Sequence, residues 1–253
     1  MTDQLKILIA CHKPYPVPAE ACYLPTEVGA ARHEESIPGF ARDDGGDNIS
    51  QKNRSFCELT AVYWAWKNLD AGAVGLVHYR RYFAKGRFFR EIAGEADFRR
   101  ALEKAPVIMP AKRHYWIETN YSQYVHAHHA QDLETTRALL AERCPEYLPA
   151  YDAGMRRRSG HRFNMFVMRR DLFDAWCAWL FPLLFEIERR LDTSGYDAYN
   201  ARVCGFLAER LLDVWLETGH VPYTEMPVLN TESQHWLRKG TTFVLRKLGL
   251  RVR

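Results

Sequence analysis

Apolar residues in this chain fall into short blocks that end abruptly at polar segments, as buried strands of an α/β sheet do. The first block, residues 6–10, stops at the polar segment 11–14. The second, residues 74–77, runs without a spacer into the ring and guanidinium groups of residues 78–82. Further blocks that predict strands lie at residues 106–110 and 163–168.

Between these blocks, apolar side chains recur at steps of three or four residues, which predicts amphipathic helices. Ser50 is expected to cap the first helix, and Pro182 to kink the fourth. Residues 14–25 and 37–50, rich in Pro, Gly, Asp and Asn, are predicted loops. The predicted helices cover residues 56–69, 89–105, a segment that starts near Asp132, residues 169–191 and residues 200–219.

The pattern therefore predicts one α/β domain, residues 1–236, with a helical C-terminal third, followed by a tail of residues 237–253. The chain has 253 residues, of which 47% are hydrophobic and 26% charged, as is usual for a folded soluble domain. A net charge of +4 is too small to imply a nucleic-acid partner.

The spacing of the cysteines and the N-terminal sequence favour a cytoplasmic protein. The six cysteines form no C-x-x-C pair, so zinc-ribbon and thioredoxin classes are unsupported. No signal peptide is recognisable at the N-terminus. The longest apolar run, residues 175–185, is too short to span a bilayer.

The tail interleaves basic and large apolar residues and contains no acid. Such a segment lies on anionic lipid, or it is simply solvated. Its composition thus leaves a peripheral position on the inner face of the membrane open. The residues are Arg238, Lys239, Phe243, Leu245, Arg246, Lys247, Leu248, Leu250, Arg251 and Arg253.

The segment after the second strand points to an anion. Ligands of α/β sheets bind beyond the carboxyl ends of the strands, and guanidinium groups bind phosphate oxygens in pairs. Arg80 and Arg81 follow the strand directly, and His78 and Tyr79 add hydrogen-bonding groups. The alternative is that the arginines form internal ion pairs with acids of a neighbouring helix.

A glutamate on a predicted helix is the candidate general base. Glu209, beside Arg210, lies in the segment GFLAERLLDVW. A helix-borne glutamate next to a substrate can accept a proton. The alternative is an exposed or ion-paired residue.

Two clusters of side chains, one of histidines and one of aspartates, are candidate metal sites. The histidines of HAHH belong to no H-E-x-x-H motif, and no Cys or Asp spacing completes a zinc pattern. The acids of DDGGD lie in a Gly-rich loop, where turn bonds are favoured over Mg²⁺ or Mn²⁺ binding. No P-loop and no G-x-G-x-x-G motif occurs, which argues against a P-loop kinase and a Rossmann dehydrogenase. The residues concerned are His114, His126, His128, His129 and His161, and Asp43, Asp44 and Asp47.

Six ordered motifs resemble a bacterial glycosyltransferase family long catalogued as a domain of unknown function and found in capsule, O-antigen and exopolysaccharide gene clusters. The motifs are CHKP, GDNIS-QKN, CELTAVYWAWKN, GLVHYRRYF, NMFVMRRDLFDAWCAWLFPLLFE and GFLAERLLDVW, between residues 7 and 232. The resemblance implies a GT-A-like α/β/α sandwich that uses a UDP-sugar. Members tied to an activity resemble inverting galactofuranosyltransferases, so the implied sugar is galactofuranose, with galactopyranose as the other choice.

This chain departs from the GT-A pattern at one place. The strand that usually ends in a metal-binding Asp-x-Asp pair here ends in residues 78–81. Cationic side chains can offset the charge of a leaving diphosphate directly. We therefore expect no metal and no other cofactor.

The resemblance, joined to the residue pattern, assigns roles. His12 and Lys13 would border the nucleotide, and Asp47, Asn48, Ser50 and Asn53 would hold uridine or ribose. His78, Arg80 and Arg81 would neutralise the diphosphate, next to Tyr79, and Asn164 and Met165 would border the sugar. Glu209 would deprotonate the acceptor, oriented by Arg202 or Arg210.

Other classes remain open at this point. A non-catalytic carbohydrate- or anion-binding module of a polysaccharide assembly complex suits an aromatic-rich chain equally well. A metal-dependent hydrolase built on the histidines is a third class. For the leading interpretation, the partners are a UDP-sugar and a glycan or lipid-linked acceptor, with no nucleic acid.

Overall fold

The computed structural model describes residues 3–86, 88 and 90–232. The basic tail predicted for residues 237–253 lies outside them. The strands are β1 Leu5–Cys11, β2 Tyr23–Glu27, β3 Ala41–Arg42, β4 Ala73–His78, β5 Arg81–Lys85, β6 Glu91–Ile92, β7 Val107–Pro110, β8 Arg113–His114, β9 Ser159–Gly160, β10 Phe166–Arg169, β11 Tyr223–Met226 and β12 Val228–Asn230.

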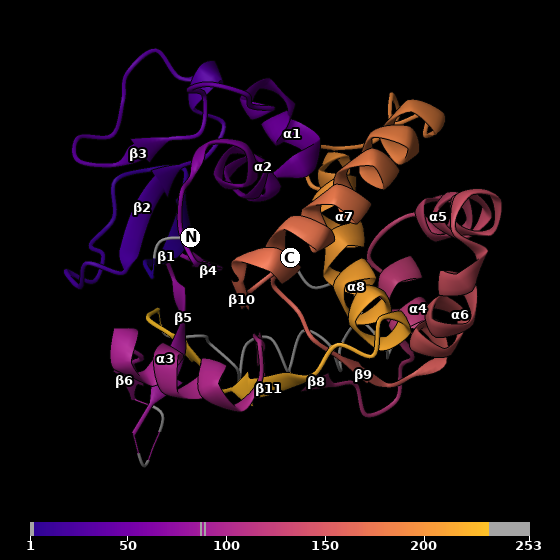
Figure 1. Cartoon of the computed structure of the whole chain (residues 1–253). Helices are drawn as coiled ribbons and strands as arrows, with labels where there is room; N and C mark the ends of the chain where they lie inside the picture. Colours follow the sequence, from indigo (N-terminus) through magenta and orange to yellow (C-terminus); the bar gives the residue numbers. More distant parts are fainter. Residues whose placement is uncertain (1–2, 87, 89, 233–253) are drawn as a thin grey trace, which may run out of the picture.

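The α-helices lie in the connections β3–β4, β6–β7, β8–β9 and β10–β11 (Figure 1). They are α1 Asn53–Phe56, α2 Leu59–Asn68, α3 Glu95–Lys104, α4 Asn120–Val125, α5 Ala130–Arg143, α6 Leu148–Arg156, α7 Arg170–Arg190 and α8 Val203–Thr218, with short 3₁₀ turns at Ala30–Arg32, Ser50–Lys52, Pro145–Tyr147 and Asn200–Arg202.

The main sheet is mixed, in the order β11-β7-β10-β4-β1-β2-β3. β4, β1, β2 and β3 run parallel to one another, whereas β10 is antiparallel to both β4 and β7. The carboxyl ends of β1, β2 and β4 therefore meet at one edge of the sheet. This is the place where open α/β sheets bind ligands.

Each face of the sheet is covered by its own apolar cluster. On one face, side chains such as Leu8 and Leu76 pack with residues of α2, α7 and α8. On the other, Ile7 and Val77 pack with Phe98 of α3 and with β5. α5 and α6 lie beyond α8 from the sheet (Figure 1). The α/β fold with helices on both faces agrees with the sequence prediction.

The central strand needs a glycine. A Cβ on Gly75 would fall 2.6 Å from Ile7 Cδ1 and 2.9 Å from Val167 Cγ2, below any normal contact distance. β4 lies between β1 and β10, so the missing side chain lets three strands and their face residues pack closely.

The predicted strands at 6–10, 74–77 and 106–110 are confirmed with small changes of their ends, and so are the helices centred on α2, α7 and α8. Other predictions of local structure were wrong. The strand predicted at residues 163–168 begins only at Phe166, and the loop predicted at residues 37–50 contains β3. The segment 14–25 is not all loop, because β2 pairs with β1. The predicted helix 89–105 starts only at Glu95, after β6. The C-terminal third is largely helical, as predicted, and it also returns to the sheet through β11 and β12.

Ser50 does not cap a helix through its side chain. Its hydroxyl donates to Asp43 Oδ1 at 2.5 Å and accepts the Ala31 N–H at 3.0 Å. The hydroxyl therefore ties the loop together instead. Within residues 3–232 as far as they are described, the helices are all too short or too polar to cross a bilayer.

Candidate functional site

A cavity of ≈ 590 Å³ opens at the carboxyl ends of β1 and β4. This volume suits a ligand of nucleotide-sugar or similar size. The β1 end, the start of α1 and α2, the β4–β5 turn, the loop before β10 and the face of α8 all contribute to its wall. The lining residues are Ala10, His12, Val28, Asn53, Arg54, Cys57, Glu58, His78, Tyr79, Arg80, Arg81, Phe163, Ala198, Tyr199, Arg202, Phe206 and Glu209.

A tight hairpin separates the two adjacent arginines. His78 pairs with Arg81 across the β4–β5 turn, so Tyr79 and Arg80 form the turn itself. Arg80 is half-exposed, with Nη1 2.8 Å from Glu232 Oε2 and the guanidinium over the Tyr79 ring. The alternative of an ion pair is thus realised for Arg80, though with an acid after β12 and not with a helix.

Arg81 is placed differently. Its guanidinium stacks on the Phe163 ring, 4.5 Å from the centroid. Its buried Nε has no hydrogen-bond partner among the described residues. Burial, together with the charge of Arg80, lowers the pKa of Arg81, yet an arginine stays protonated in proteins. Arg81 is therefore a partly desolvated cation that faces the cavity with unused donor capacity.

The loop before β10 is held in an uncommon backbone conformation. Phe163 and Asn164 have φ of 78° and 52°, in the left-handed region. Such residues cost of order 1–3 kcal/mol each and persist where the surroundings fix them. His78 Nε2 donates to the Phe163 carbonyl, and Asn164 Nδ2 donates to Glu58 Oε1 at 2.7 Å and to the Gly205 carbonyl at 2.9 Å.

The same loop positions both carboxylates of the cavity. The Phe163 N–H donates to Glu209 Oε1 at 3.1 Å, while Asn164 holds Glu58. Burial raises the pKa of Glu209, and the nearby Glu58 charge adds to this, against the lowering by Arg210 and Arg162. A carboxylate with a raised pKa that is 19% exposed is suited to accept a proton from a bound hydroxyl.

Glu58 was missed by the sequence analysis. It immediately precedes the apolar face of α2, where an acid is ordinarily explained by the helix dipole. Its place before α2 reveals nothing of its contact with residue 164, which lies more than 100 positions away and bonds to it across the fold. No local pattern would have signalled it.

Cations outnumber acids around the cavity. Arg54, Arg80, Arg81 and Arg202 face the two carboxylates, and the rings of Tyr79, Tyr199 and Phe206 complete the wall. His12 packs edge-on against Tyr79, with centroids 5.1 Å apart, and burial and the adjacent cations lower its pKa. The cavity therefore suits an anion that carries apolar or ring surfaces.

The structure brings most of the predicted residues to the cavity, but not all. Those that line it are His12, Asn53, His78, Tyr79, Arg80, Arg81, Arg202 and Glu209. Lys13 lies just outside, with Nζ 5.7 Å from the Tyr79 ring.

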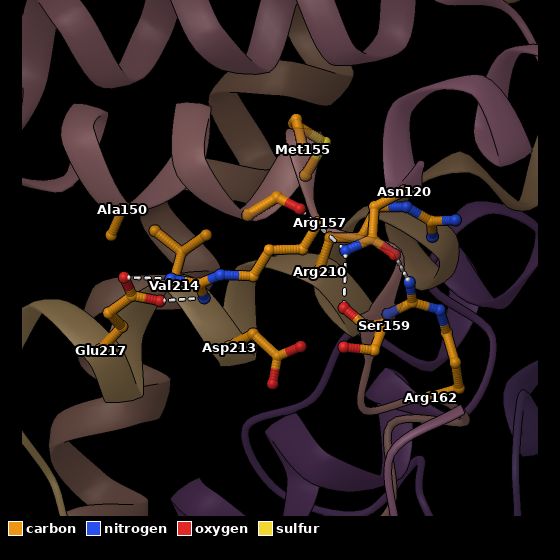
Figure 2. Close-up of a pocket in the computed structure, with 11 residues that line it drawn as sticks. Asn120, Ala150, Met155, Arg157, Ser159, Arg162, Arg210, Asp213, Val214 and Glu217 are labelled. Carbon is orange, nitrogen blue, oxygen red and sulfur yellow. Dashed lines mark hydrogen bonds and ion pairs between the residues drawn. The ribbon is translucent and has the colours of Figure 1, made fainter. Parts of the chain in front are cut away.

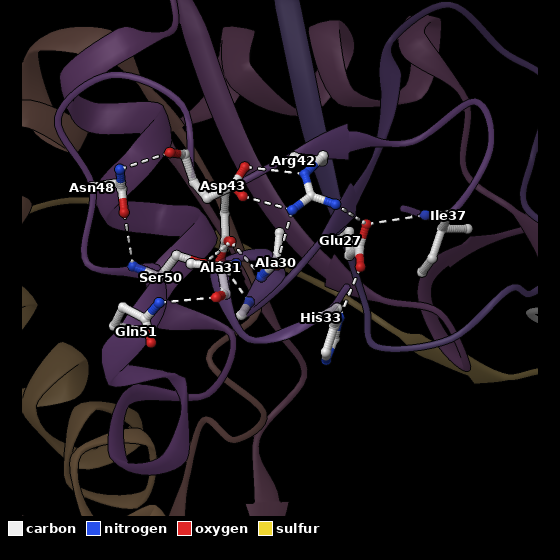
Figure 3. A network of polar contacts seen from close by, with 12 residues as sticks. Glu27, Ala30, Ala31, His33, Ile37, Arg42, Asp43, Asn48, Ser50 and Gln51 are labelled. Atoms are coloured by element: carbon white, nitrogen blue, oxygen red, sulfur yellow. Dashed lines mark hydrogen bonds and ion pairs between the residues drawn. The ribbon is translucent and has the colours of Figure 1, made fainter. Parts of the chain in front are cut away.

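Asn48 and Ser50 belong to a separate polar network (Figure 3), and neither they nor Asp47 line the cavity. Asn48 Nδ2 donates to the Asp44 carbonyl, and Asn48 Oδ1 accepts the Ser50 N–H at 3.1 Å. Asp47 Oδ1 accepts the Tyr63 hydroxyl at 3.2 Å. The uridine or ribose contacts assigned to these three side chains are thus not supported by their placement, because their polar atoms stabilise the loop.

The other acids of this loop are also engaged. Asp43, fully buried, accepts the Gly29 and Ala30 N–H groups and the Ser50 hydroxyl. Asp44 pairs with Arg42 at 2.6 Å, which lowers the pKa of Asp44. Arg42 Nη1 also lies 3.5 Å from Glu27 Oε2, and Figure 3 shows these two side chains next to each other. The turn-bond interpretation of DDGGD agrees with these contacts.

Three further residues that were predicted to bind the substrates do not line the cavity. Met165 is fully buried in the apolar cluster beneath β10. Asn164 acts on Glu58, as described above. Arg210 points to the Phe206 carbonyl and Gln123, with its guanidinium over the Tyr124 ring.

The histidines of HAHH point to different partners. His126 bonds Glu118, His128 bonds Asn200 and stacks on Tyr199, and His129 stacks on Tyr196. In the described ranges, no group of three or more His, Cys, Asp and Glu side chains is arranged to hold a metal ion.

Comparisons with known proteins identify the family and the fold of this chain. Residues 6–220 match the profile of a family described as a domain of unknown function, DUF4422. No curated protein matches the chain. Among solved structures, the chain is similar to the apo structure of WbbM, a bifunctional glycosyltransferase, with 30% identity and a TM-score of 0.84 over 91% of this chain. The match covers 46% of the WbbM chain, so this chain spans about half of its length. The mixed sheet with flanking helices is thereby a GT-A-like glycosyltransferase fold.

Proposed function

We propose, from the premise that this chain belongs to the DUF4422 family, that it is a glycosyltransferase with a nucleoside-diphosphate sugar as donor. The observation that carries the proposal is the combination, in one cavity, of the partly desolvated cation Arg81, whose buried Nε has no hydrogen-bond partner among the described residues, with the carboxylates Glu58 and Glu209. An anion-binding group beside a proton acceptor is what transfer from a phosphate leaving group requires. The similarity to a bifunctional glycosyltransferase supports it.

In the proposed reaction, an acceptor hydroxyl attacks the anomeric carbon of the donor. The bond from that carbon to the diphosphate oxygen breaks, and its electron pair leaves with the nucleoside diphosphate. The acceptor proton passes to Glu209. The guanidinium of Arg81 stabilises the negative charge that develops on the leaving oxygen, and its partial burial strengthens this effect.

The finer proposals concern the donor and the stereochemistry. The motif resemblance favours UDP-galactofuranose, with UDP-galactopyranose as the alternative sugar, and an inverting transfer. A single displacement that needs one base and no protein nucleophile is consistent with inversion. Metal independence is part of the proposal. It is supported by the motif resemblance, which implies an Asp-x-Asp pair at the end of a strand that here ends in His78, Arg80 and Arg81.

The second candidate is a binding module without transfer activity. Tyr199 is 53% exposed at the cavity and lies 5.2 Å from Phe206, centroid to centroid, so the rings offer a surface for a sugar. This surface would serve a bound glycan whether or not a reaction followed.

A donor assay separates the two. The purified chain is incubated with UDP-, GDP- and dTDP-sugars, with and without glycan acceptors, and free nucleotide is measured. A glycosyltransferase releases UDP slowly from its donor alone and faster with acceptor. Thermal stabilisation by a UDP-sugar with no release under any condition would leave only the binding module.

We also propose an acceptor and a location for the whole protein. The acceptor is proposed to be a growing polysaccharide or a lipid-linked glycan on the cytoplasmic side. Membrane contact through residues 237–253 remains a prediction. Deleting that tail is expected to reduce flotation with anionic liposomes and to leave UDP binding intact.

A further inference from the structure

Large apolar side chains are exposed between the end of β8 and the first turn of α4. Trp116 is 90% exposed, Ile117 65% and Tyr121 40%. Single exposed apolar residues are common on protein surfaces, but a cluster with a nearly bare tryptophan marks an interaction site.

Arginines lie beside this segment. β8 pairs with β9, and the Tyr115 N–H donates to the Arg158 carbonyl at 2.6 Å. The Asn120 N–H donates to the Arg157 carbonyl at 2.8 Å, so the run of residues 156–158 follows the Trp116 segment closely. We name the exposed apolar and basic group the Trp116 patch: Arg113, Trp116, Ile117, Tyr121, Arg156 and Arg158.

The charge of the patch is not cancelled locally. No described carboxylate forms an ion pair with Arg113, Arg156 or Arg158, all three of which are exposed. Their neighbour Arg157 pairs with Glu217, and the acid of the segment, Glu118, accepts from His126 at 2.6 Å. The patch thus presents net positive charge around an apolar centre.

The patch stands on a rigid base. Figure 2 shows Asn120 between Arg162 and Ser159, and its Nδ2 donates to the Ser159 carbonyl at 3.0 Å and to the Gly154 carbonyl at 2.8 Å. Arg162 Nε donates to the Tyr115 hydroxyl at 2.9 Å. Thr119 caps α4 by accepting the Ser122 N–H. These partly buried contacts fix the backbone around Trp116, whose own side chain is 90% exposed.

We propose that the Trp116 patch is a membrane-surface contact that inserts Trp116 and Ile117 among the headgroups of an anionic bilayer. Tryptophan prefers the membrane–water interface, and arginines near an anionic surface add electrostatic attraction. The proposal is independent of the donor and of the basic tail, since all six residues belong to the folded domain.

The test uses the full chain and vesicles of phosphatidylcholine with or without phosphatidylglycerol. Brominated lipids quench tryptophans that enter the interface, so quenching is measured for Trp116→Phe and for Trp236→Phe, which removes the tryptophan before the tail. We expect Trp116→Phe to abolish the quenching and Trp236→Phe to retain it. The reverse result would assign the membrane contact to the tail and overturn the proposal.

Charge is tested in the same assay. Arg156→Gln with Arg158→Gln is expected to weaken partition into anionic vesicles about 30-fold, because each basic group near the surface contributes roughly fivefold. The matched control, Arg100→Gln with Lys104→Gln on α3, removes the same charge away from β8 and β9 (Figure 1) and is expected to change partition less than about threefold.

Two outcomes contradict the proposal. Equal losses in the two double variants would mean that net charge alone drives binding. Concentration-dependent dimerisation without vesicles, abolished by Trp116→Phe, would mean that the patch binds a second copy of this chain. Because the Trp116 side chain is 90% exposed, its replacement is expected to leave the melting temperature unchanged, which a thermal scan verifies.

Discussion

Glu209 and Glu58 face one cavity, but different groups hold them. Glu209, on α8, accepts the backbone N–H of Phe163, whereas Glu58 accepts a hydrogen bond from the Asn164 side chain. Because burial raises the pKa of Glu209, this carboxylate is suited to accept a proton from a bound hydroxyl. The charge of Glu58 contributes to the raised pKa of Glu209, so Glu58 is the carboxylate with which Glu209 is compared.

Glu209→Gln is expected to lower transfer by about 10²–10⁴-fold and to leave UDP affinity nearly unchanged, because the amide keeps its shape but cannot accept the proton. Glu58→Gln is expected to cost less than tenfold, since its contact with Asn164 is mainly structural. Steady-state transfer and calorimetry of UDP binding measure both. Near-normal transfer by Glu209→Gln, with a large loss in Glu58→Gln, would exchange the two roles.

The pH profile checks the same assignment. A base acts only when deprotonated, so the rate rises as pH increases through its pKa. A raised pKa of Glu209 places the acid limb of kcat/KM above the pH at which an ordinary glutamate titrates. Glu209→Gln should lose this limb in its residual activity. An acid limb that persists unchanged would point to another base.

Arg81 and Arg80 are adjacent in sequence but differ in environment. Arg81→Ala is expected to lower turnover by roughly 10²–10³-fold and to weaken UDP binding, because a preorganised donor to the leaving phosphate is lost. Arg80→Ala is expected to weaken UDP binding less than about fivefold, since its side chain is 44% exposed and paired with Glu232. Calorimetry of UDP binding compares them. If both variants bind UDP like the parent, the arginines are structural.

At the scale of the element, β4 determines where the cavity forms. Its close packing against β1 and β10 depends on Gly75, and its hairpin with β5 divides the arginine pair. A disturbance of this strand therefore affects both stability and the site.

Gly75→Ala is expected to lower the free energy of unfolding by about 1–3 kcal/mol, because the methyl group overlaps Ile7 and Val167. The matched control is Gly154→Ala on α6, where the added Cβ would meet nothing within 4 Å. That change should stabilise by about 0.5–1 kcal/mol through helix propensity. Urea unfolding measures both, and equal effects would contradict the packing argument.

At the scale of the whole molecule, the proposed function requires positive charge beside the diphosphate of a donor. The cavity supplies four arginines. The charge for a bound diphosphate is thus available from the protein itself.

UDP at 100-fold its dissociation constant is expected to stabilise the protein by about 2.7 kcal/mol, with or without EDTA. Turnover of the UDP-sugar is likewise expected to survive the chelator. Thermal scans and a UDP-release assay provide the readouts. Complete loss of turnover with EDTA, restored by Mn²⁺, would show that a metal takes part.

Local patterns were sufficient for the core. The apolar blocks at residues 6–10 and 74–77 became β1 and β4, because burial on both faces of a parallel strand demands apolar side chains whatever the partner. Much of the cavity could also be predicted, since polar groups that follow such strands necessarily gather at one sheet edge. His12, His78 and Arg81 were found in this way.

Only the tertiary structure decided which polar residues share the cavity. β2 was missed because its Pro-containing segment becomes a strand through pairing with β1, and Glu58 was missed because its partner Asn164 lies far away in sequence. The two arginines looked equivalent as neighbours. A two-residue turn places Arg80 in solvent beside Glu232 and Arg81 on a strand against Phe163, and that difference depends on pairing across the sheet, which the local order of residues does not contain.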